Sequence, residues 1–424
     1  MLSFLSDFIS IKTLKNLTTL MTGTIISVLI PVLTAPISSR IFNSTDYGVL
    51  GLYMAVSGLI SVVAYAHYQH GILLEKDSDG ARQMIWFTMF FCLLVSIFSA
   101  MVVLTIYLST NIIQESEVGL WFLFLPVSII CSGITSCLLI WANRIQQYKS
   151  LAVNRVIQSA LTVIIQIALG LLIKNETGLL VGFIGGQIIS ALLLLQKFYV
   201  KNETGIGFPQ LSTFKEFAYK YRGLLFFSAP SEFINTLINQ SPVFLLQRFA
   251  GISYVGNYNF SQRLLGMPQT LLSSAIVEVF RQKAALEYHN NGDCRPIFMK
   301  TLKALSAISL VPFLILFLFA PSLFAFIFGE QWREAGVISQ MLGILYLFRF
   351  IISPLTYVYT IAGKFKEDFV MHILLLMATL GSFYVGSLFV HDDKYLLLIY
   401  SIAYASFYLI YLYRSYQLSK KHNG

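Results

Sequence analysis

The chain has 424 residues, of which 56% are hydrophobic and only 12% are charged. A soluble domain carries roughly 25% charged residues, so this composition excludes a soluble globular protein and indicates a surface that faces lipid. The formal net charge of +9 could suggest nucleic acid as a partner, but we expect none, because the basic residues follow the pattern of a membrane topology.

Apolar stretches long enough to cross a bilayer recur along the whole chain. A membrane-spanning helix needs about 20 predominantly apolar residues, and the sequence predicts about twelve of them, so we expect an all-α integral membrane protein. The first stretch is too long for a cleavable signal peptide, and we expect it to remain as the first span. The last two spans are separated only by a tight hairpin at His391–Lys394. The predicted spans lie near 16–38, 47–66, 84–108, 119–141, 153–173, 178–200, 223–247, 254–277, 304–328, 336–361, 369–390 and 395–413.

The lysines and arginines predict the orientation of these spans. Most of them lie in segments that face the cytoplasm if both termini are cytoplasmic. The segments on the other side hold only Arg40, Lys174, Arg248, Arg333 and Lys394. This asymmetry is the positive-inside rule, so we expect a multi-pass protein with an even number of spans and both termini cytoplasmic.

The two halves of the chain repeat a short motif. Residues 40–48 run from Arg to Gly between the first two predicted spans, and residues 248–256 do the same between the seventh and eighth. Six spans is an even number, so the halves would be parallel repeats with the binding site between them. We expect an N-terminal six-helix lobe over 1–207 and a C-terminal six-helix lobe over 208–424. Chance similarity between two membrane helices is the alternative.

Few charged residues lie inside the predicted spans, where each costs about 2.5–3.5 kcal/mol on insertion scales. Glu232, Arg263 and Arg349 lie near the middle of spans. Polar side chains on the same helix faces must contact protein or water and not lipid, so this pattern favours a hydrated cavity. The candidate cavity residues are Arg40, Gln158, Asn235, Asn239, Arg248, Gln262, Arg263 and Arg349.

The polar stripes also have a structural interpretation. Asn154, Gln158 and Gln166 recur at helical spacing along the fifth span and can equally hydrogen-bond a neighbouring helix. For that span both interpretations stay open. Glu232 and Arg263 could form a simple ion pair, which would still need polar surroundings.

Sequence motifs for catalysis and metal binding are missing. The chain has no Walker A loop, no H-E-x-x-H and no G-x-S-x-G, and its four cysteines do not have the spacing of a metal site or a disulfide framework. His67 and His70, at a span end, are more typical of a membrane interface than of a metal site. We therefore expect a secondary transporter or flippase and not an enzyme, with no metal and no cofactor.

Three motifs carry a resemblance to a known family. The first is the proline-rich run 31–42 followed by Asp-Tyr-Gly at 46–48. The second is 319–336, in which Ala-Pro, Phe-Gly, Trp and Ala-Gly follow one another, and the third is Val-Gly-Asn-Tyr at 255–258. Over roughly 15–410 the sequence resembles the polysaccharide and O-antigen flippases of the multidrug/oligosaccharidyl-lipid/polysaccharide exporter superfamily.

The resemblance implies two six-helix lobes around a central cavity that opens alternately to the two sides. The implied cargo is an undecaprenyl-pyrophosphate-linked oligosaccharide, an O-antigen, capsule or exopolysaccharide repeat unit, carried across the cytoplasmic (inner) membrane. Its partners would be this lipid-linked oligosaccharide, membrane lipids and a coupling proton or sodium ion, with polysaccharide polymerase machinery as a further candidate. Arg263 and Arg349 suit the pyrophosphate. Glu232 is the candidate for ion coupling, because a carboxyl at membrane depth can exchange a proton.

Two other functions fit this sequence less well. A drug/cation antiporter of the same superfamily would need an acidic cavity, whereas the mid-span charges are one acid and two arginines. A polysaccharide polymerase or ligase would carry a large outside loop with catalytic charge, and every predicted outside loop is short.

Overall fold

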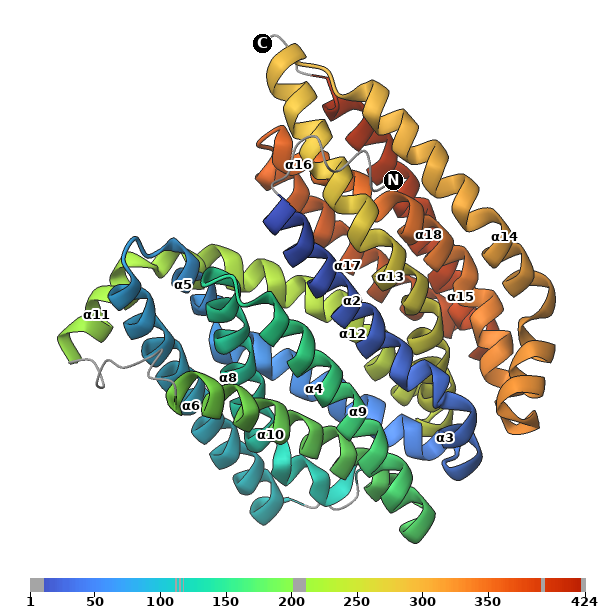
Figure 1. The fold of residues 1–424 in the computed structure, drawn as a ribbon. Coiled ribbons are helices and arrows are strands. Elements are labelled where there is room, and N and C mark those ends of the chain that lie inside the picture. Colours follow the sequence, from blue (N-terminus) through green and yellow to red (C-terminus); the bar gives the residue numbers. More distant parts are fainter. Residues whose placement is uncertain are drawn as a thin grey trace. The chain divides into compact units, whose positions relative to one another are not determined.

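The computed structural model describes residues 11–110, 113, 116, 118–200, 211–389 and 393–420. These residues form helices almost throughout (Figure 1), contain no strand, and have an isolated bridge between Asp293 and Lys420. Within them, ten helices are long and apolar enough to cross a membrane, and each overlaps one predicted span. The predicted all-α membrane class is therefore confirmed. Part of the predicted hairpin at His391–Lys394 lies outside the described residues.

The chain divides into two compact units. Unit 1 comprises residues 1–42 and 49–236, and unit 2 comprises residues 43–48 and 237–424. Two helices, α4 (Ser44–Tyr65) and α12 (Ala229–Ala250), contribute to both. The predicted boundary at 207/208 lies outside the described residues and stays a prediction.

Unit 1 is built from long helices that pack in pairs (Figure 1). Helix α9 packs against both α2 and α10, and α6 packs against α8. Its helices are α2 (Ile11–Leu33), α3 (Ala35–Ile41), most of α4 (Ser44–Tyr65), α5 (Gly71–Leu74), α6 (Ser78–Ser109), α8 (Leu125–Arg144), α9 (Tyr148–Ile173), α10 (Glu176–Val200), α11 (Leu211–Lys220) and the start of α12.

The first predicted span is broken between α2 and α3. Pro36 lies in the first turn of α3, where it has no N–H for the Val32 carbonyl oxygen and its ring would clash with that carbonyl, so the helix is interrupted at Thr34. At this break the Ile30 carbonyl oxygen accepts two hydrogen bonds from Thr34, one from its hydroxyl at 2.8 Å and one from its backbone N–H at 3.1 Å. Proline thus explains the kink.

Small residues allow α9 and α10 to approach closely. A side chain at Gly182 would overlap Gln166, and one at Gly186 would overlap Thr162. Close backbone approach through small residues is the usual way in which membrane helices associate, because lipid provides no hydrophobic driving force between them.

Two amides of the fifth predicted span link the same helices. The Asn154 amide donates to the Ser190 hydroxyl at 2.8 Å, and the Gln166 amide donates to the Leu179 carbonyl oxygen at 3.1 Å. All four residues are buried. For these two side chains the structure shows contacts between helices, as expected of polar groups that hold a membrane bundle together.

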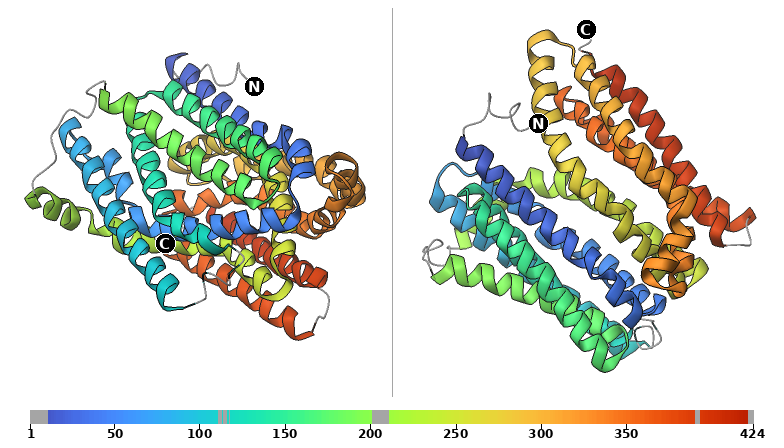
Figure 2. Two further views of the ribbon diagram at one scale, coloured as in Figure 1. Left: turned by 90° about the horizontal axis from the view of Figure 1, so that it is seen from below. Right: turned by 45° about the vertical axis from the view of Figure 1, so that its right-hand side comes forward.

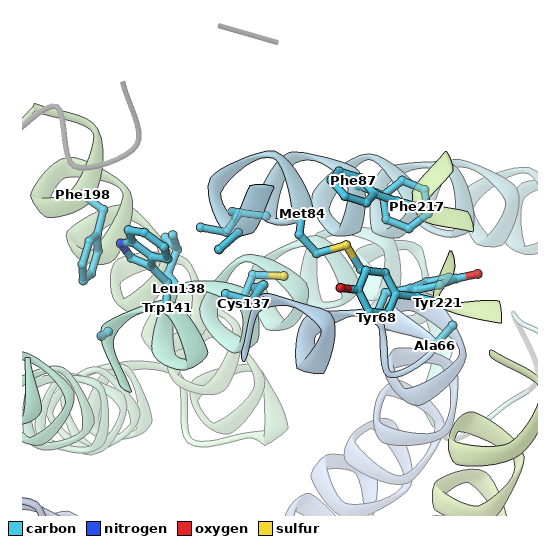
Figure 3. Packing of buried hydrophobic residues seen from close by; sticks show 14 of the residues in the cluster. Ala66, Tyr68, Met84, Phe87, Cys137, Leu138, Trp141, Phe198, Phe217 and Tyr221 are labelled. Carbon is cyan, nitrogen blue, oxygen red and sulfur yellow. The ribbon is translucent and has the colours of Figure 1, made fainter. Parts of the chain in front are cut away.

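A buried aromatic cluster fixes α11 to unit 1 (Figure 3). Phe217 lies in α11, and Tyr221 directly follows the end of this helix. Both side chains point into a core that also contains Tyr68 and Phe87. The ring centroids of Phe87 lie 6.1 Å from Phe217 and 4.9 Å from Tyr68. Edge-on and tilted aromatic pairs at these distances are favourable beyond the area that they bury. The connection between the two halves of the chain is thus anchored on unit 1.

A buried carboxylate reinforces this anchor. Glu75, whose side chain is only 5% exposed, accepts hydrogen bonds from Lys220 Nζ at 2.6 Å and from the Tyr221 hydroxyl at 2.8 Å. The hydrogen bond to Glu75 raises the pKa of Lys220. A raised lysine pKa adds stability at every pH below the usual lysine value, and this contribution is lost only when the pH rises through the raised value.

Removing the lysine should leave that carboxylate poorly compensated. We expect Lys220→Met to destabilise unit 1 by about 1–3 kcal/mol, because a buried charge loses a charge-assisted hydrogen bond. The measurement is the apparent melting temperature of the purified protein in detergent. Lys215→Met, on an exposed position of the same helix, is the control and should leave it unchanged. Adding Glu75→Gln to Lys220→Met should recover part of the loss. A further loss in the double variant would contradict the charge argument.

Unit 2 is organised around α15 (Arg333–Ile352). This helix packs against α13, α14 and α18, and Figure 2 shows the long helices of this unit, yellow to red, running beside one another. The remaining helices are the rest of α12, α13 (Ile252–Asn291), α14 (Arg295–Phe328), α16 (Val358–Ile361), α17 (Phe365–Phe389) and α18 (Asp393–Leu418).

Parts of the three sequence motifs pack together in unit 2, where Asn257 of the third motif donates a hydrogen bond to Glu334 of the second at 3.0 Å. Trp332 is fully buried and stacks on Phe260, with ring centroids 4.1 Å apart. Tyr47, from the segment 43–48, meets Trp332 edge-on at 5.4 Å and Phe260 at the same distance. This packing explains why a segment from the first half of the chain belongs to unit 2. The motifs therefore have a structural role.

The repeated glycines make a reciprocal contact within unit 2. A side chain at Gly48 would overlap the Ile252 carbonyl oxygen, and a side chain at Gly256 would overlap the Ser44 carbonyl oxygen. Ile252 lies one helical turn before Gly256, and Ser44 lies one helical turn before Gly48. Each glycine therefore contacts the carbonyl oxygen one turn before the other glycine. A two-fold related repeat would produce such an exchange, and the repeat itself stays a prediction.

Candidate functional site

Two predicted spans are helical but are not among the ten apolar helices. They are 223–247, which overlaps α12, and 254–277, which lies within α13. These are the helices on which the polar candidates are concentrated. The twelve-span count thus stays a prediction for these two, and their polarity marks them as the place to look for a site.

Unit 1 contains four of the candidate residues. Arg40 is exposed in the last turn of α3, whereas Gln158 of α9 is half-buried. Glu232 and Asn235 lie in the part of α12 that belongs to unit 1, and both are half-buried. Since Arg263 belongs to unit 2, the ion pair between it and Glu232 stays a prediction.

Glu232 acts electrostatically on the turn that follows α4. Partial burial lowers the pKa of His70, and the charge of Glu232 opposes this shift by favouring the protonated ring. The neighbouring His67 ring lies 4.9 Å from the His70 ring, and its pKa is also lowered by burial. His70 therefore interacts electrostatically with both Glu232 and His67 within unit 1.

Unit 2 brings two of the candidates into direct contact. Arg349 Nη2 donates a hydrogen bond to Asn239 Oδ1 at 3.0 Å, which joins α15 to α12. Gln262 of α13 donates to the Tyr258 hydroxyl at 3.0 Å. Arg248, in the last turn of α12, is exposed.

Arg349 is surrounded by tyrosines from three helices. They are all buried, and each is close enough to interact electrostatically with the guanidinium. Tyr404 and Tyr408 stack with ring centroids 5.0 Å apart. The five residues are Tyr258 of α13, Tyr346 of α15, and Tyr400, Tyr404 and Tyr408 of α18.

Arg263 differs from Arg349 in its surroundings. Within the described residues its guanidinium has neither a hydrogen-bond nor an ion-pair partner, although the side chain is half-buried in α13. A partly desolvated guanidinium without a counterion is a strong anion site, because it presents five donors in a planar fork. Unit 2 thus combines one uncompensated arginine with one held by an amide and tyrosines.

Sequence reasoning missed two groups of residues. The tyrosines of α18 recur every four residues, a signal that was readable as one helix face. Arg155 lies inside a candidate membrane span, and its Nη1 donates to the Thr24 hydroxyl at 2.6 Å. Its position near a span end made it look like a cytoplasmic topology charge.

Metal binding receives no support from the described part of the chain. No group of three or more histidine, cysteine, aspartate or glutamate side chains there could hold a metal ion. The four cysteines are free and buried, as expected of packing residues.

Comparison with known proteins adds a family. A family model described as polysaccharide biosynthesis protein matches residues 37–337. The teichuronic acid biosynthesis protein TuaB of Bacillus subtilis is 24% identical over 128 residues, which cover 30% of this chain and 26% of that protein. The match therefore spans only about a quarter of the length of this curated relative.

Solved structures show the same fold. The inward-facing form of a multidrug resistance MATE family transporter of the MOP superfamily has a TM-score of 0.63 at 15% identity, covering 98% of this chain and 97% of that one. A MOP superfamily transporter from Pyrococcus furiosus has a TM-score of 0.60 at 13% identity, covering 95% and 94%. The resemblance expected from the motifs is confirmed.

Proposed function

Because the chain belongs to the polysaccharide biosynthesis protein family, we propose that it is a flippase for an undecaprenyl-pyrophosphate-linked oligosaccharide. This family and this fold are those of membrane transporters and not of enzymes. The protein would lie in the cytoplasmic (inner) membrane with both termini cytoplasmic. The main support for this function is the pair of half-buried arginines in unit 2, Arg263 and Arg349.

The two arginines match the pyrophosphate, which is the part of this cargo with the largest free-energy cost of crossing a bilayer. Moving a pyrophosphate through a bilayer requires that its charge be compensated throughout, and bidentate guanidinium contacts are the strongest that a protein can offer. Arg263 would provide the first contact, because no described residue holds its guanidinium. Arg349 would exchange its bond with Asn239 for a phosphate oxygen.

The amides and tyrosines match the sugar part. Hydroxyl groups of an oligosaccharide need donors and acceptors wherever they leave water, and Asn235, Asn239, Gln158 and Gln262 provide both. Tyrosine presents an apolar ring and a polar hydroxyl, which suits the two kinds of surface on a sugar. O-antigen, capsule and exopolysaccharide units share these features, so the site is compatible with any of them.

A drug/cation antiporter is the second candidate, favoured by the fold shared with a multidrug resistance MATE family transporter. Its cationic substrates would need acidic partners at membrane depth. The candidate set of this chain is instead Glu232 against Arg263 and Arg349, so the charges favour an anionic cargo. A drug-efflux assay in a sensitised host separates the two functions.

Glu232 is proposed to couple transport to an ion gradient. A carboxyl that gains and loses a proton within the span changes the charge of unit 1 and can bias the conformation of the transporter. We expect Glu232→Gln to flatten the pH dependence of transport, because glutamine cannot titrate. The measurement is uptake by proteoliposomes at several pH values, with Glu216→Gln on exposed α11 as the control. Wild-type pH dependence in Glu232→Gln would rule out this role.

The proposed function is tested in cells that lack the protein. We expect them to lose surface polysaccharide and to accumulate the lipid-linked repeat unit, with both defects reversed by the wild-type gene. Unchanged surface polysaccharide would contradict a flippase for this cargo.

A further inference from the structure

Unit 1 contains a cavity of about 620 Å³ between α9 and α10, two helices that lie side by side (Figure 1). Its walls are polar at one end and apolar along the rest. The lining residues are Lys149, Ser150, Val153, Asn154, Ile157, Leu193, Leu194, Gln196 and Lys197.

The cavity carries positive charge at the end of the membrane spans. Lys149 lies in the first turn of α9 and Lys197 in the last turn of α10, so both lysines lie at the end of candidate membrane spans, where lipid headgroups are expected. None of the described lining residues is acidic. Basic pockets of this kind between membrane helices suit phosphate headgroups.

One lining residue of the cavity, Asn154, has a buried acceptor without a donor. Asn154 is only 4% exposed, and its amide nitrogen is used by Ser190, whereas Asn154 Oδ1 has no hydrogen-bond partner in the described structure. Buried acceptors are nearly always paired, so this oxygen calls for a donor from a ligand. Helical side chains tilt toward the N-terminus of their helix. Helices α9 and α10 are antiparallel, so the side chains of Asn154 and Lys197 tilt toward one another along the helix axes.

An apolar groove continues from the cavity. A second hollow of about 250 Å³, between α2 and α9, shares Val153 and Ile157 with the first. Its other walls include Ile26, Ala152 and Val156. A ligand whose headgroup binds between α9 and α10 can thus extend an apolar chain past Val153 and Ile157 into the second hollow.

We propose that these two hollows bind one anionic phospholipid of the bilayer whose headgroup carries a hydroxyl, as in phosphatidylglycerol. Its phosphate lies between Lys149 and Lys197, its hydroxyl donates to Asn154 Oδ1, and an acyl chain lies against Val153 and Ile157. This site is a resident lipid site of unit 1 and does not depend on the proposed cargo.

The charge part is tested by lipid binding to the purified full chain in detergent, followed by native mass spectrometry. Each lysine near a headgroup is worth about fivefold in affinity, so Lys149→Gln/Lys197→Gln should bind phosphatidylglycerol roughly 30-fold more weakly than wild type. Lys215→Gln, an exposed lysine of the same unit, should bind as wild type. Equal binding by the double variant, or equal binding of phosphatidylcholine by wild type, would overturn the proposal.

The hydroxyl part is tested with phosphatidylmethanol, which has the same charge but no headgroup hydroxyl. Wild type should prefer phosphatidylglycerol by about tenfold, the value of one hydrogen bond to a buried acceptor. Asn154→Leu should bind the two lipids equally. Equal binding by wild type, or preference for a polyprenyl phosphate over phosphatidylglycerol, would overturn the assignment.

Discussion

Replacing Arg263 or Arg349 by alanine is expected to abolish surface polysaccharide while the protein still inserts into the membrane. Each substitution removes a guanidinium that would form two charge-assisted hydrogen bonds to the pyrophosphate, worth about 1.5–3 kcal/mol each. The loss corresponds to a factor of roughly 100 or more in transport rate. The measurement is complementation of cells that lack the protein, with its membrane level checked by immunoblot.

A lysine variant and an exposed arginine of unit 1 sharpen this test. Lysine keeps the charge but not the planar fork, so Arg349→Lys should retain part of the function. Arg222→Ala removes an exposed cation that lies over the Tyr219 ring, 4.5 Å from its centroid, and should complement fully. Normal polysaccharide in both Arg263→Ala and Arg349→Ala would remove the basis for an anionic cargo.

Gly256→Ala is expected to destabilise unit 2 by about 3 kcal/mol or more. The added methyl group would overlap the Ser44 carbonyl oxygen, and a backbone atom held by α4 cannot move aside as a flexible side chain can. The Ser44 and Ser253 hydroxyls, 2.6 Å apart, depend on the same close approach. The measurement is the apparent melting temperature in detergent, together with the yield of monodisperse protein.

The same helix offers a matched control for this substitution. A side chain at Gly266 of α13 would meet nothing within 4 Å, so Gly266→Ala should be neutral or stabilising by up to about 1 kcal/mol, because alanine favours helix over glycine. Equal effects of Gly256→Ala and Gly266→Ala would show that helix propensity, and not the contact with Ser44, determines the stability.

Much of the fold was predictable because membrane helices are specified locally. The length and apolarity of each stretch were enough for ten spans. The same rule is weakest where side chains must face water or cargo, and α12 and α13, which carry most of the polar candidates, are not among those ten in the part of the chain that the structure describes. The packing of Tyr47 against Trp332 joins positions far apart in the chain, and hydropathy has no information about such a contact.

The candidate site was predictable only one helix at a time. Charge at membrane depth is expensive, so Arg349 could be selected from the sequence alone. Its tyrosine neighbours on α18 depend on how α15 and α18 pack, which a single helix pattern does not determine. Asn154 could also be selected from the sequence, but the polar stripe does not determine what it contacts. Its position is equally compatible with a contact to Ser190 and with a ligand.

Reconstituted flipping is the most direct test of the proposed transport. Liposomes that contain the purified protein and an undecaprenyl-pyrophosphate-linked oligosaccharide, with a fluorescent sugar in both leaflets, are treated with a membrane-impermeant quencher. If the protein carries this cargo, fluorescence should fall toward zero with wild type and stop near one half with Arg263→Ala/Arg349→Ala, where the inner leaflet stays protected. Quenching that stops near one half with wild type as well would contradict the proposed function.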